Sequence, residues 1–249
     1  IPVLQTTFAF TAITVALELA IGLAFALILV KPFRGRGLVR AGQFGAGAPA
    51  GTEAMAAYVQ GVVNAGGIVV LLDRSNAYGS LHPDAAHAWV RGALPEIASL
   101  VEVFMGDALV CGPGIRPFLW RGAFQGCAGS PAEYGGTNEG LFERDRGELA
   151  ELQVTSVSYL DDGGMAAGRD VPINNLARAV QLVRASGERA GLRLNLAKCK
   201  VLVPVDRLDS PEVNDLLRRI GGGITACTGT TVLGVPVGPQ EYVRAATTA

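Results

Sequence analysis

Residues 156–163 read Ser-Val-Ser-Tyr-Leu-Asp-Asp-Gly, and the rest of the chain is best understood from this stretch outward. A run rich in β-formers leads into two adjacent carboxylates, Asp161 and Asp162, and then into a double glycine. The pattern predicts a strand, a tight turn and a returning strand, with the acids held at the turn. Adjacent residues of a strand point to opposite faces, so these two acids do not form a pair with each other. Asp-Asp-Gly is also ordinary turn chemistry, and alone it indicates no more than a turn.

A third acid stands at the end of a second predicted strand. Residues 68–72 read Ile-Val-Val-Leu-Leu, an apolar run typical of a buried strand, and Asp73 follows directly. Two neighbouring strands that each deliver an aspartate at their tip would hold a pair of hard divalent cations through carboxylate oxygens. The sequence therefore indicates a site in which Asp73 joins the acid pair.

Five short segments include these acids and follow one another in a fixed order. They are residues 72–81 (LDRSNAYGSL), 121–131 (RGAFQGCAGSP), 159–162 (YLDD), 191–199 (GLRLNLAKC) and 233–238 (LGVPVG). In this order they resemble the palm motifs of reverse transcriptases, specifically those of non-LTR retrotransposons. Each segment alone is a weak signal, but five in the family's order over residues 42–249 are strong evidence of common descent.

The resemblance implies a role for each matching residue. Asp73, Asp161 and Asp162 match the metal-binding catalytic aspartates, which hold two Mg²⁺ or Mn²⁺ ions when the site is active. The remaining matches are to family residues around the incoming nucleotide. Tyr78 matches the aromatic that screens the sugar 2′ position, Gln125 and Gly126 match the loop that packs under the templating pair, and Lys198 matches the lysine near the leaving pyrophosphate. Residues 233–238 match the primer-grip turn.

The resemblance also implies a fold and a reaction. The expected fold is α/β (α+β): a polymerase palm over residues 42–249, with an antiparallel sheet and helices on one face. The expected function is that of an RNA-directed DNA polymerase, a nucleotidyltransferase whose partners are an RNA template, a DNA primer and a dNTP. In-line displacement at phosphorus depends mainly on positioning and charge neutralisation, which two metal ions supply.

The charge of the chain is unusual for such a protein. The 249 residues carry 21 basic and 22 acidic side chains, a formal net charge of −1. Four of the basic residues and one acidic residue lie in the first 41, so the remainder carries 17 and 21, a net charge of −4. Gripping template and primer phosphates favours the opposite balance. Complete fingers and thumb segments are also not visible around the palm motifs, which indicates a fragmentary or inactive copy.

The first segment of the chain has a different character. Residues 8–30 are almost wholly apolar and are followed by the basic residues Lys31, Arg34, Arg36 and Arg40. Twenty-three helical residues reach about 35 Å, which is enough to cross a bilayer. The pattern predicts a single hydrophobic, transmembrane helix with its basic end in the cytoplasm, and a buried soluble helix is the alternative. Membrane association follows if this helix inserts, and an intracellular location if it does not.

A second resemblance falls on the same segment. Residues 14–24 followed by 31–37 resemble a membrane helix and loop of ABC-type sugar-transporter permeases, so residues 1–41 form a separate, permease-like unit. No site for an ATPase subunit is visible in it. This leaves open a second class of function, a membrane transport component anchored by the N-terminal helix. A permease needs several spans, however, and no second run of 18 or more apolar residues follows.

The rest of the chain predicts ordinary elements. Helices are expected over 83–93 and 96–105, a strand pair over 108–111 and 118–120, and further strands over 200–205 and 231–237. Apolar residues recur at helical spacing from Ile173 to Val183, and Ser210 is expected to cap a helix that runs to Ile220. Residues 132–140 contain three glycines and no apolar face, so a helix is expected only from about Leu141 to Leu152. The four cysteines show no zinc spacing and are expected to be buried or incidental thiols.

Overall fold

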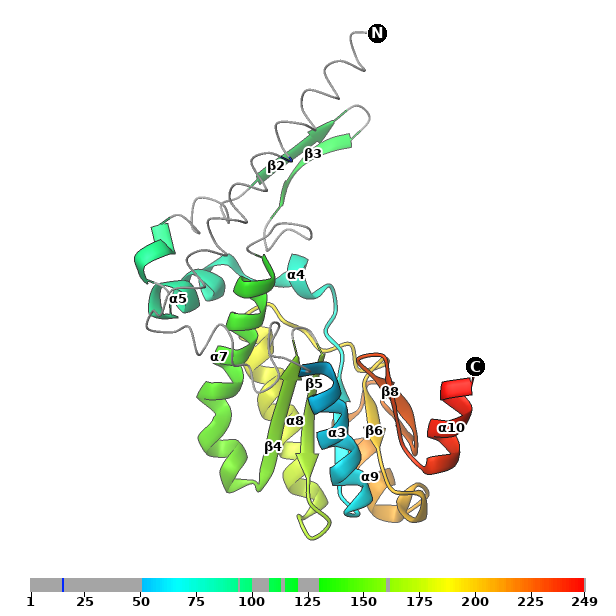
Figure 1. The fold of residues 1–249 in the computed structure, drawn as a ribbon. Coiled ribbons are helices and arrows are strands. Elements are labelled where there is room, and N and C mark those ends of the chain that lie inside the picture. The colour runs from blue at the N-terminus through cyan, green and yellow to red at the C-terminus, as the bar shows by residue number, and fades with distance from the viewer. Residues whose placement is uncertain are drawn as a thin grey trace.

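The structure is a computed structural model that describes Val15 and residues 51–93, 95–99, 108–112, 115–120, 130–159 and 162–248. Its helices are α3 (Gly51–Asn64), α4 (Ala77–Ser80), α5 (Pro83–Ala93), the 3₁₀ turn η1 (Pro95–Ile97), α7 (Ser130–Glu151), α8 (Ile173–Arg189), the 3₁₀ turn η2 (Val205–Arg207), α9 (Pro211–Ile220) and α10 (Gln240–Thr248). Its strands are β1 (Ile68–Leu72), β2 (Ala108–Gly112), β3 (Ile115–Trp120), β4 (Val154–Tyr159), β5 (Asp162–Ala167), β6 (Lys200–Leu202), β7 (Thr225–Cys227), β8 (Thr230–Val232) and β9 (Val235–Val237). Figure 1 shows a central sheet with helices packed around it.

The central sheet has the strand order β4-β5-β1-β6-β7. β1 pairs antiparallel with β5 and with β6, and β4 and β5 form an antiparallel hairpin. The predicted antiparallel sheet is therefore confirmed for these four strands. It is wrong for β7, which runs parallel to β6. Helix α9 lies between β6 and β7 in the sequence, so the two strands are joined by a helical crossover connection. A connection of this kind allows the two strands to pair in parallel.

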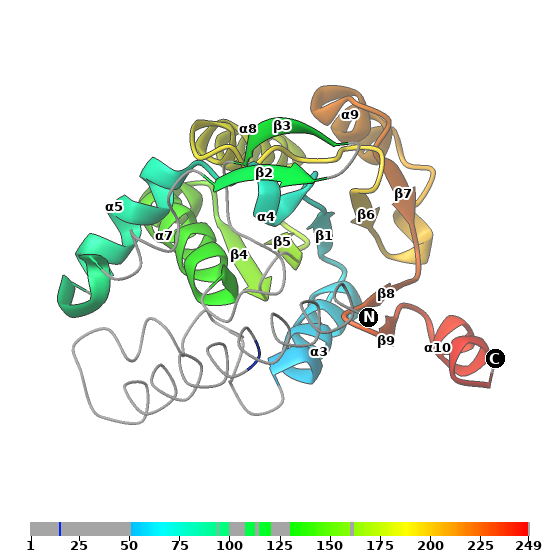
Figure 2. The ribbon, with the colours of Figure 1, turned by 90° about the horizontal axis from the view of Figure 1, so that it is seen from above.

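Helices cover both faces of this sheet, so the prediction of helices on one face is wrong. Ile68, Val70 and Leu72 of β1 pack with residues of α7, α8 and α9, whereas Val69 packs with residues of α3 and of the β8–β9 hairpin. Figure 2 shows α3 on the opposite side of β1 from α8 and α9. The physical reason is that residues 68–72 are apolar at every position, and a strand of this kind must be covered on both faces.

Helix α7 departs most from the sequence-based expectation. It is continuous from Ser130 to Glu151 and passes through the glycines that were expected to delay the helix until Leu141. A Cβ on Gly136 would overlap the indole ring of Trp89 on α5, and a Cβ on Gly140 would lie 3.1 Å from an atom of the same ring. The glycines therefore let α7 approach α5 closely, and they form a packing surface instead of a helix stop.

Most of the other expected elements are confirmed. α5 has the expected bounds, α8 buries Leu176, Val180 and Val183, and β2 pairs with β3. The hydroxyl of Ser210 accepts a hydrogen bond from the backbone N–H of Val213 at 3.2 Å and caps α9. The strand expected over 200–205 is shorter, and the strand expected over 231–237 is instead the β8–β9 hairpin. It turns at Leu233 and Gly234, both of which have positive φ.

The predicted hydrophobic helix over residues 8–30 lies outside the described residues, apart from Val15. Residues 100–105 of the helix expected over 96–105 also lie outside them. Within the described part of the chain, no helix is long and apolar enough to cross a membrane.

Candidate active site

The register of the central strands places Asp73 and Asp162 next to each other at one end of the sheet. β1 and β5 pair Leu72 with Gly163, and the two aspartates are the next residues of these strands in the same register. Both continue the alternation of Val69 and Ala166, which pack on the α3 side of the sheet. Cα atoms of facing residues in antiparallel strands are about 5 Å apart, so the two carboxylates lie on one face close to each other.

A cavity of 170 Å³ is lined by both acids. Its walls come from five separate segments of the chain: Met55; Leu71, Leu72 and Asp73; Asp162 and Gly163; Lys198 and Lys200; and Thr230, Thr231, Val232 and Leu233. The structure therefore brings Asp73, Asp162 and Lys198 together with the start of the 233–238 segment. These residues are far apart in the sequence, and the fold gathers them at one end of three adjacent strands and one hairpin.

The backbone at Asp73 is held by the segment that carries Lys198. The N–H of Asp73 donates a hydrogen bond to Sγ of Cys199 at 3.3 Å, and its carbonyl accepts one from the N–H of Asn195 at 2.8 Å. Cys199 is buried, and desolvation raises the pKa of its thiol. The sequence predicted a buried or incidental thiol at this position, and the thiol is buried. No local pattern signalled its contact with Asp73, because that contact depends on the pairing of β6 with β1.

Arg74, the residue after Asp73, ties the site to α7 and to the loop after α8. Its Nη1 donates to the carbonyl oxygen of Leu192 at 2.8 Å, and its Nη2 donates to Oδ1 of Asn138 at 2.8 Å. Arg74 is only 8% exposed, and desolvation lowers the pKa of its guanidinium. Gly187 on α8 leaves room for this side chain, because a Cβ there would lie 2.5 Å from Nη1. Arg74 thus anchors the strand end from which Asp73 projects.

Tyr78 lies on α4 and contacts α7. Its ring stacks on Tyr134, with centroids 4.8 Å apart and an interplanar angle of 28°. Tyr134 is fully buried, so the stack fixes α4 against α7. Tyr78 is not among the described residues that line the cavity at Asp73. Its role beside the sugar of an incoming nucleotide therefore stays a prediction.

Asp161, Gln125 and Gly126 lie outside the described residues, and their roles also stay predictions. Within the described ranges, no three His, Cys, Asp or Glu side chains come together as a metal-binding group. Asp73 and Asp162 nevertheless present carboxylates to one cavity, and carboxylate oxygens are the ligands that Mg²⁺ and Mn²⁺ prefer. The described donors fit these metals, with Asp161 as the expected third ligand.

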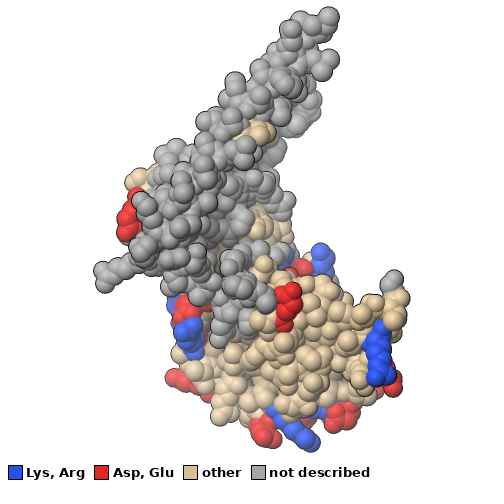
Figure 3. Space-filling view, viewed as in Figure 1, with Lys and Arg blue, Asp and Glu red and all other residues tan. Residues whose placement is uncertain are grey.

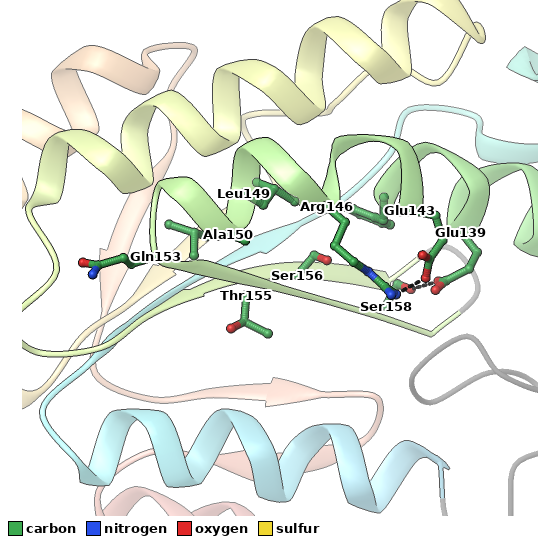
Figure 4. A pocket seen from close by; sticks show the side chains of 11 residues that line it. Glu139, Glu143, Arg146, Leu149, Ala150, Gln153, Thr155, Ser156 and Ser158 are labelled. Carbon is green, nitrogen blue, oxygen red and sulfur yellow. Dashed lines mark hydrogen bonds and ion pairs between the residues drawn. The ribbon is translucent and has the colours of Figure 1, made fainter.

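A second cavity, of 390 Å³, lies between α7 and the edge strand β4. Figure 4 shows Glu139 beside Ser158 and Arg146 beside Glu143 at one end of it. The hydroxyl of Ser158 donates to the carboxylate of Glu139 at 2.9 Å, yet desolvation raises the pKa of this carboxyl. None of the residues predicted for the site lines this cavity, so it is separate from the candidate active site.

A buried acid on α7 makes stability depend on pH. Burial raises the pKa of Glu133 from 4.5 to about 7. The folded protein holds the proton of the Glu133 carboxyl more tightly than the unfolded chain does. The contribution of this protonated carboxyl to the free energy of unfolding is therefore full below about pH 4.5 and is lost as the pH rises through 7. We expect Glu133→Gln to raise the free energy of unfolding by about 1 to 3 kcal/mol at pH 8, with a smaller effect at pH 5.

Urea denaturation of both proteins at the two pH values measures this difference. Glu148→Gln on the exposed side of the same helix is the matched control, and it is expected to change stability little at either pH. A gain from Glu133→Gln that is equal at pH 5 and pH 8 would show that the carboxyl does not titrate in this range.

The surface charge around the site is mixed. α3, which covers the same face as the two acids, carries Glu53 as its single charged side chain. Figure 3 shows Lys and Arg interspersed with Asp and Glu around the margin of this face, with a largely uncharged centre. In the described part of this face, no broad basic surface accompanies the candidate site, which agrees with the charge balance of the sequence.

No protein-family model and no curated protein matches the chain, but several solved structures match its fold. Apo telomerase from Candida tropicalis matches with a TM-score of 0.57 at 11% identity, over 79% of this chain and 36% of that chain. The same telomerase truncated from its C-terminal domain matches with a TM-score of 0.57 at 14% identity, over 89% and 44%. Telomerase from Candida albicans in complex with a TWJ fragment of telomeric RNA gives a TM-score of 0.51 at 11% identity, over 77% and 32%.

At these identities the likeness shows the fold alone. Telomerase is a reverse-transcriptase-related enzyme, so the chain has a reverse-transcriptase-like fold. The chain spans less than half the length of the telomerase chains that it matches. The comparisons give no support to the permease resemblance of residues 1–41.

Proposed function

We propose that this chain is a reverse-transcriptase-like protein of non-LTR retrotransposon type whose site is built for template-directed nucleotidyl transfer by two-metal catalysis. The observation that supports the proposal most is the single cavity lined by Asp73, Asp162, Lys198 and Leu233. Each of these residues matches a different motif of the family, and nothing but the fold connects them. A chance resemblance of short segments has no reason to place its key residues around one cavity.

In the proposed reaction, the 3′ oxygen of a DNA primer forms a bond to the α-phosphorus of a dNTP. The bond from that phosphorus to the bridging oxygen of the β-phosphate breaks, pyrophosphate leaves, and the proton of the primer hydroxyl passes to solvent. Asp73, Asp161 and Asp162 would hold two Mg²⁺ or Mn²⁺ ions, which supply charge neutralisation at the phosphates. Lys198 would neutralise charge on the leaving pyrophosphate, and the hydrogen bond from the N–H of Asn195, in the same turn, to the carbonyl of Asp73 supports this role.

The proposed partners are an RNA template and a DNA primer. Telomerase structures of the same fold include complexes with a fragment of telomeric RNA, and that binding is a property of those proteins. For this chain the fold supports a nucleic-acid partner, and the net charge of −4 over residues 42–249 indicates that it is held weakly.

Metal binding is the first test. Clustered carboxylates repel one another without a cation, so Mg²⁺ or Mn²⁺ should stabilise the fold on binding. At a metal concentration of roughly ten times the dissociation constant, the gain is about 1.4 kcal/mol, or an increase in Tm of about 3 to 6 °C. We expect this shift in the wild type and none in Asp73→Asn.

The matched control is Asp170→Asn, which removes an exposed carboxylate from the turn after β5, at the other end of the sheet. It should keep the full shift. Absence of a metal response in the wild type, or an equal response in Asp73→Asn, would contradict the proposed site.

Primer extension is the second arm of the same test. Because the matched segment carries net negative charge, we expect no extension above background from the isolated chain. Templated extension that disappears in Asp161→Asn would overturn this expectation of inactivity and would establish the proposed reaction directly.

A further inference from the structure

We infer that Lys200 is a phosphate-binding residue that positions the nucleic-acid strand entering the cavity at Asp73. The inference rests on the proposed function, but the family resemblance assigns no role to Lys200. Lys200 lines the same cavity as Asp73, Asp162 and Lys198, and it reaches the cavity from β6. A cavity with two lysines and two aspartates can accept a phosphate and a metal side by side.

The sheet determines where this second lysine lies. Lys200 pairs with Leu71 in the register of β6 with β1, which is two residues inward from Asp73. Leu202, two residues further along β6, packs on the α3 side, so the alternation puts Lys200 on the same face as Asp73. At about 3.3 Å per residue, Lys200 lies roughly 7 Å deeper in the sheet than the aspartate. Lys198, in contrast, precedes the strand and belongs to a turn.

The ammonium group of Lys200 is fixed by the β8–β9 hairpin. Its Nζ donates a hydrogen bond to Oγ1 of Thr230 at 2.9 Å, and Thr230 is 4% exposed. A lysine ammonium has three N–H donors, so this bond leaves donors for a ligand. Within the described part of the chain, no carboxylate forms a salt bridge with Lys200. Because its hydrogen-bond partner is a neutral hydroxyl and not a carboxylate, the ammonium group of Lys200 has, among the described residues, no counter-charge that an incoming anion would have to displace.

The position favours a phosphodiester of a nucleic-acid strand over a free triphosphate or pyrophosphate. Lys200 lies against the β8–β9 hairpin, and the 233–238 segment starts at the turn of this hairpin. Because β1 lies between β5 and β6 in the sheet, Lys200 and Asp162 are on opposite sides of Asp73. A strand lying along β8 would place a backbone phosphate at Lys200 and its end toward Asp73. Thr230, by holding Nζ, would set the height of that phosphate above the sheet.

The test measures the affinity of the full chain for a fluorescent primer–template duplex by anisotropy, in EDTA and over a series of salt concentrations. We expect Lys200→Gln to raise Kd roughly three- to tenfold at low salt and to lower the slope of log K against log salt by about 0.9, the value for one phosphate contact. Thr230→Val keeps the charge but removes the anchor, so a smaller rise in Kd is expected.

Two controls separate this contact from other effects. Arg178→Gln makes the same change of charge at an exposed position of α8, on the far side of the sheet, and should leave Kd nearly unchanged. Lys198→Gln tests whether the bound phosphate belongs to pyrophosphate and not to the nucleic-acid strand. We expect Lys198→Gln to weaken the binding of pyrophosphate and Lys200→Gln to leave it unchanged.

No duplex binding by the wild type, or an unchanged Kd and salt slope in Lys200→Gln, would overturn the inference. Loss of pyrophosphate binding with unchanged duplex binding in Lys200→Gln would overturn it as well, because the anion at Lys200 would then be the leaving group. Because the measurement is made in EDTA, it is independent of the metal site. A failed metal response with a positive Lys200 result would reject the proposed catalytic function and leave a strand-binding cavity.

Discussion

Replacing Arg74 with methionine is expected to lower the free energy of unfolding by about 3 to 5 kcal/mol, the largest effect of any single change considered for this protein. The guanidinium donates one hydrogen bond to Leu192 and one to Asn138 in a region from which water is excluded. Methionine matches part of the volume but offers no donor. The buried carbonyl of Leu192 would then lose its charged partner, and such a loss costs about 1 to 3 kcal/mol per group.

Urea denaturation with the linear extrapolation measures this change. Arg193→Met is the matched control, because it removes an exposed arginine next to Leu192, in the loop that Arg74 contacts. This change should alter the free energy of unfolding by less than about 0.5 kcal/mol. Arg74→Lys should fall between the two, since a single ammonium cannot reproduce the fork of the guanidinium. If Arg74→Met lowers stability by less than about 1 kcal/mol, the guanidinium is not the anchor of the strand end at Asp73.

Gly136→Ala is expected to lower the free energy of unfolding by about 3 kcal/mol, although alanine is normally the better helix former. The added methyl group would overlap the ring of Trp89, which lies against α7 at this point. Either the indole must leave its position or α5 and α7 must separate, and both disrupt a packed interface.

The same helix offers a control with the opposite expected sign. Gly147 has open space where its Cβ would be, so Gly147→Ala should raise stability by about 0.5 to 1 kcal/mol. In a Trp89→Ala background the cost of Gly136→Ala should largely disappear, which a double-mutant cycle by thermal or urea denaturation would show. A persistent cost in that background would mean that Trp89 is not the obstacle.

Local signals identified the strand over residues 68–72, the hairpin at the acid pair and the cap at Ser210, because a short apolar run, turn chemistry and capping involve residues close in sequence. Motif order identified the cavity residues Asp73, Asp162 and Lys198, which the fold brings together.

The misjudged features depend on partners far away in the chain. Gly136 favours a loop when it is considered alone, and only Trp89, 47 residues earlier, makes it a helix-packing residue. Likewise, nothing within the three residues of β7 indicates that they pair parallel to β6. Cys199 lies behind Asp73, and Lys200 lines the cavity. Predicting either position requires the register of β6 with β1, which no local sequence pattern encodes.

The order of the central sheet has a consequence for synthesis on the ribosome. β1 leaves the ribosome long before its two neighbours, since β5 begins 90 residues after β1 ends and β6 follows later still. At 5 to 20 residues per second, the nascent strand therefore waits on the order of 10 s for its first partner. During this time an uncharged Ile-Val-Val-Leu-Leu segment is available for wrong pairing with other chains.

Helix α3 precedes β1 and packs on it through Val59 and Val63, so one face of the strand can be shielded as soon as both have emerged. The other face must wait for α7 and α8. A chain released before residue 162 would thus expose a half-covered apolar strand, and a chaperone that binds at that stage would protect it, since β1 precedes its partners β5 and β6 in the chain.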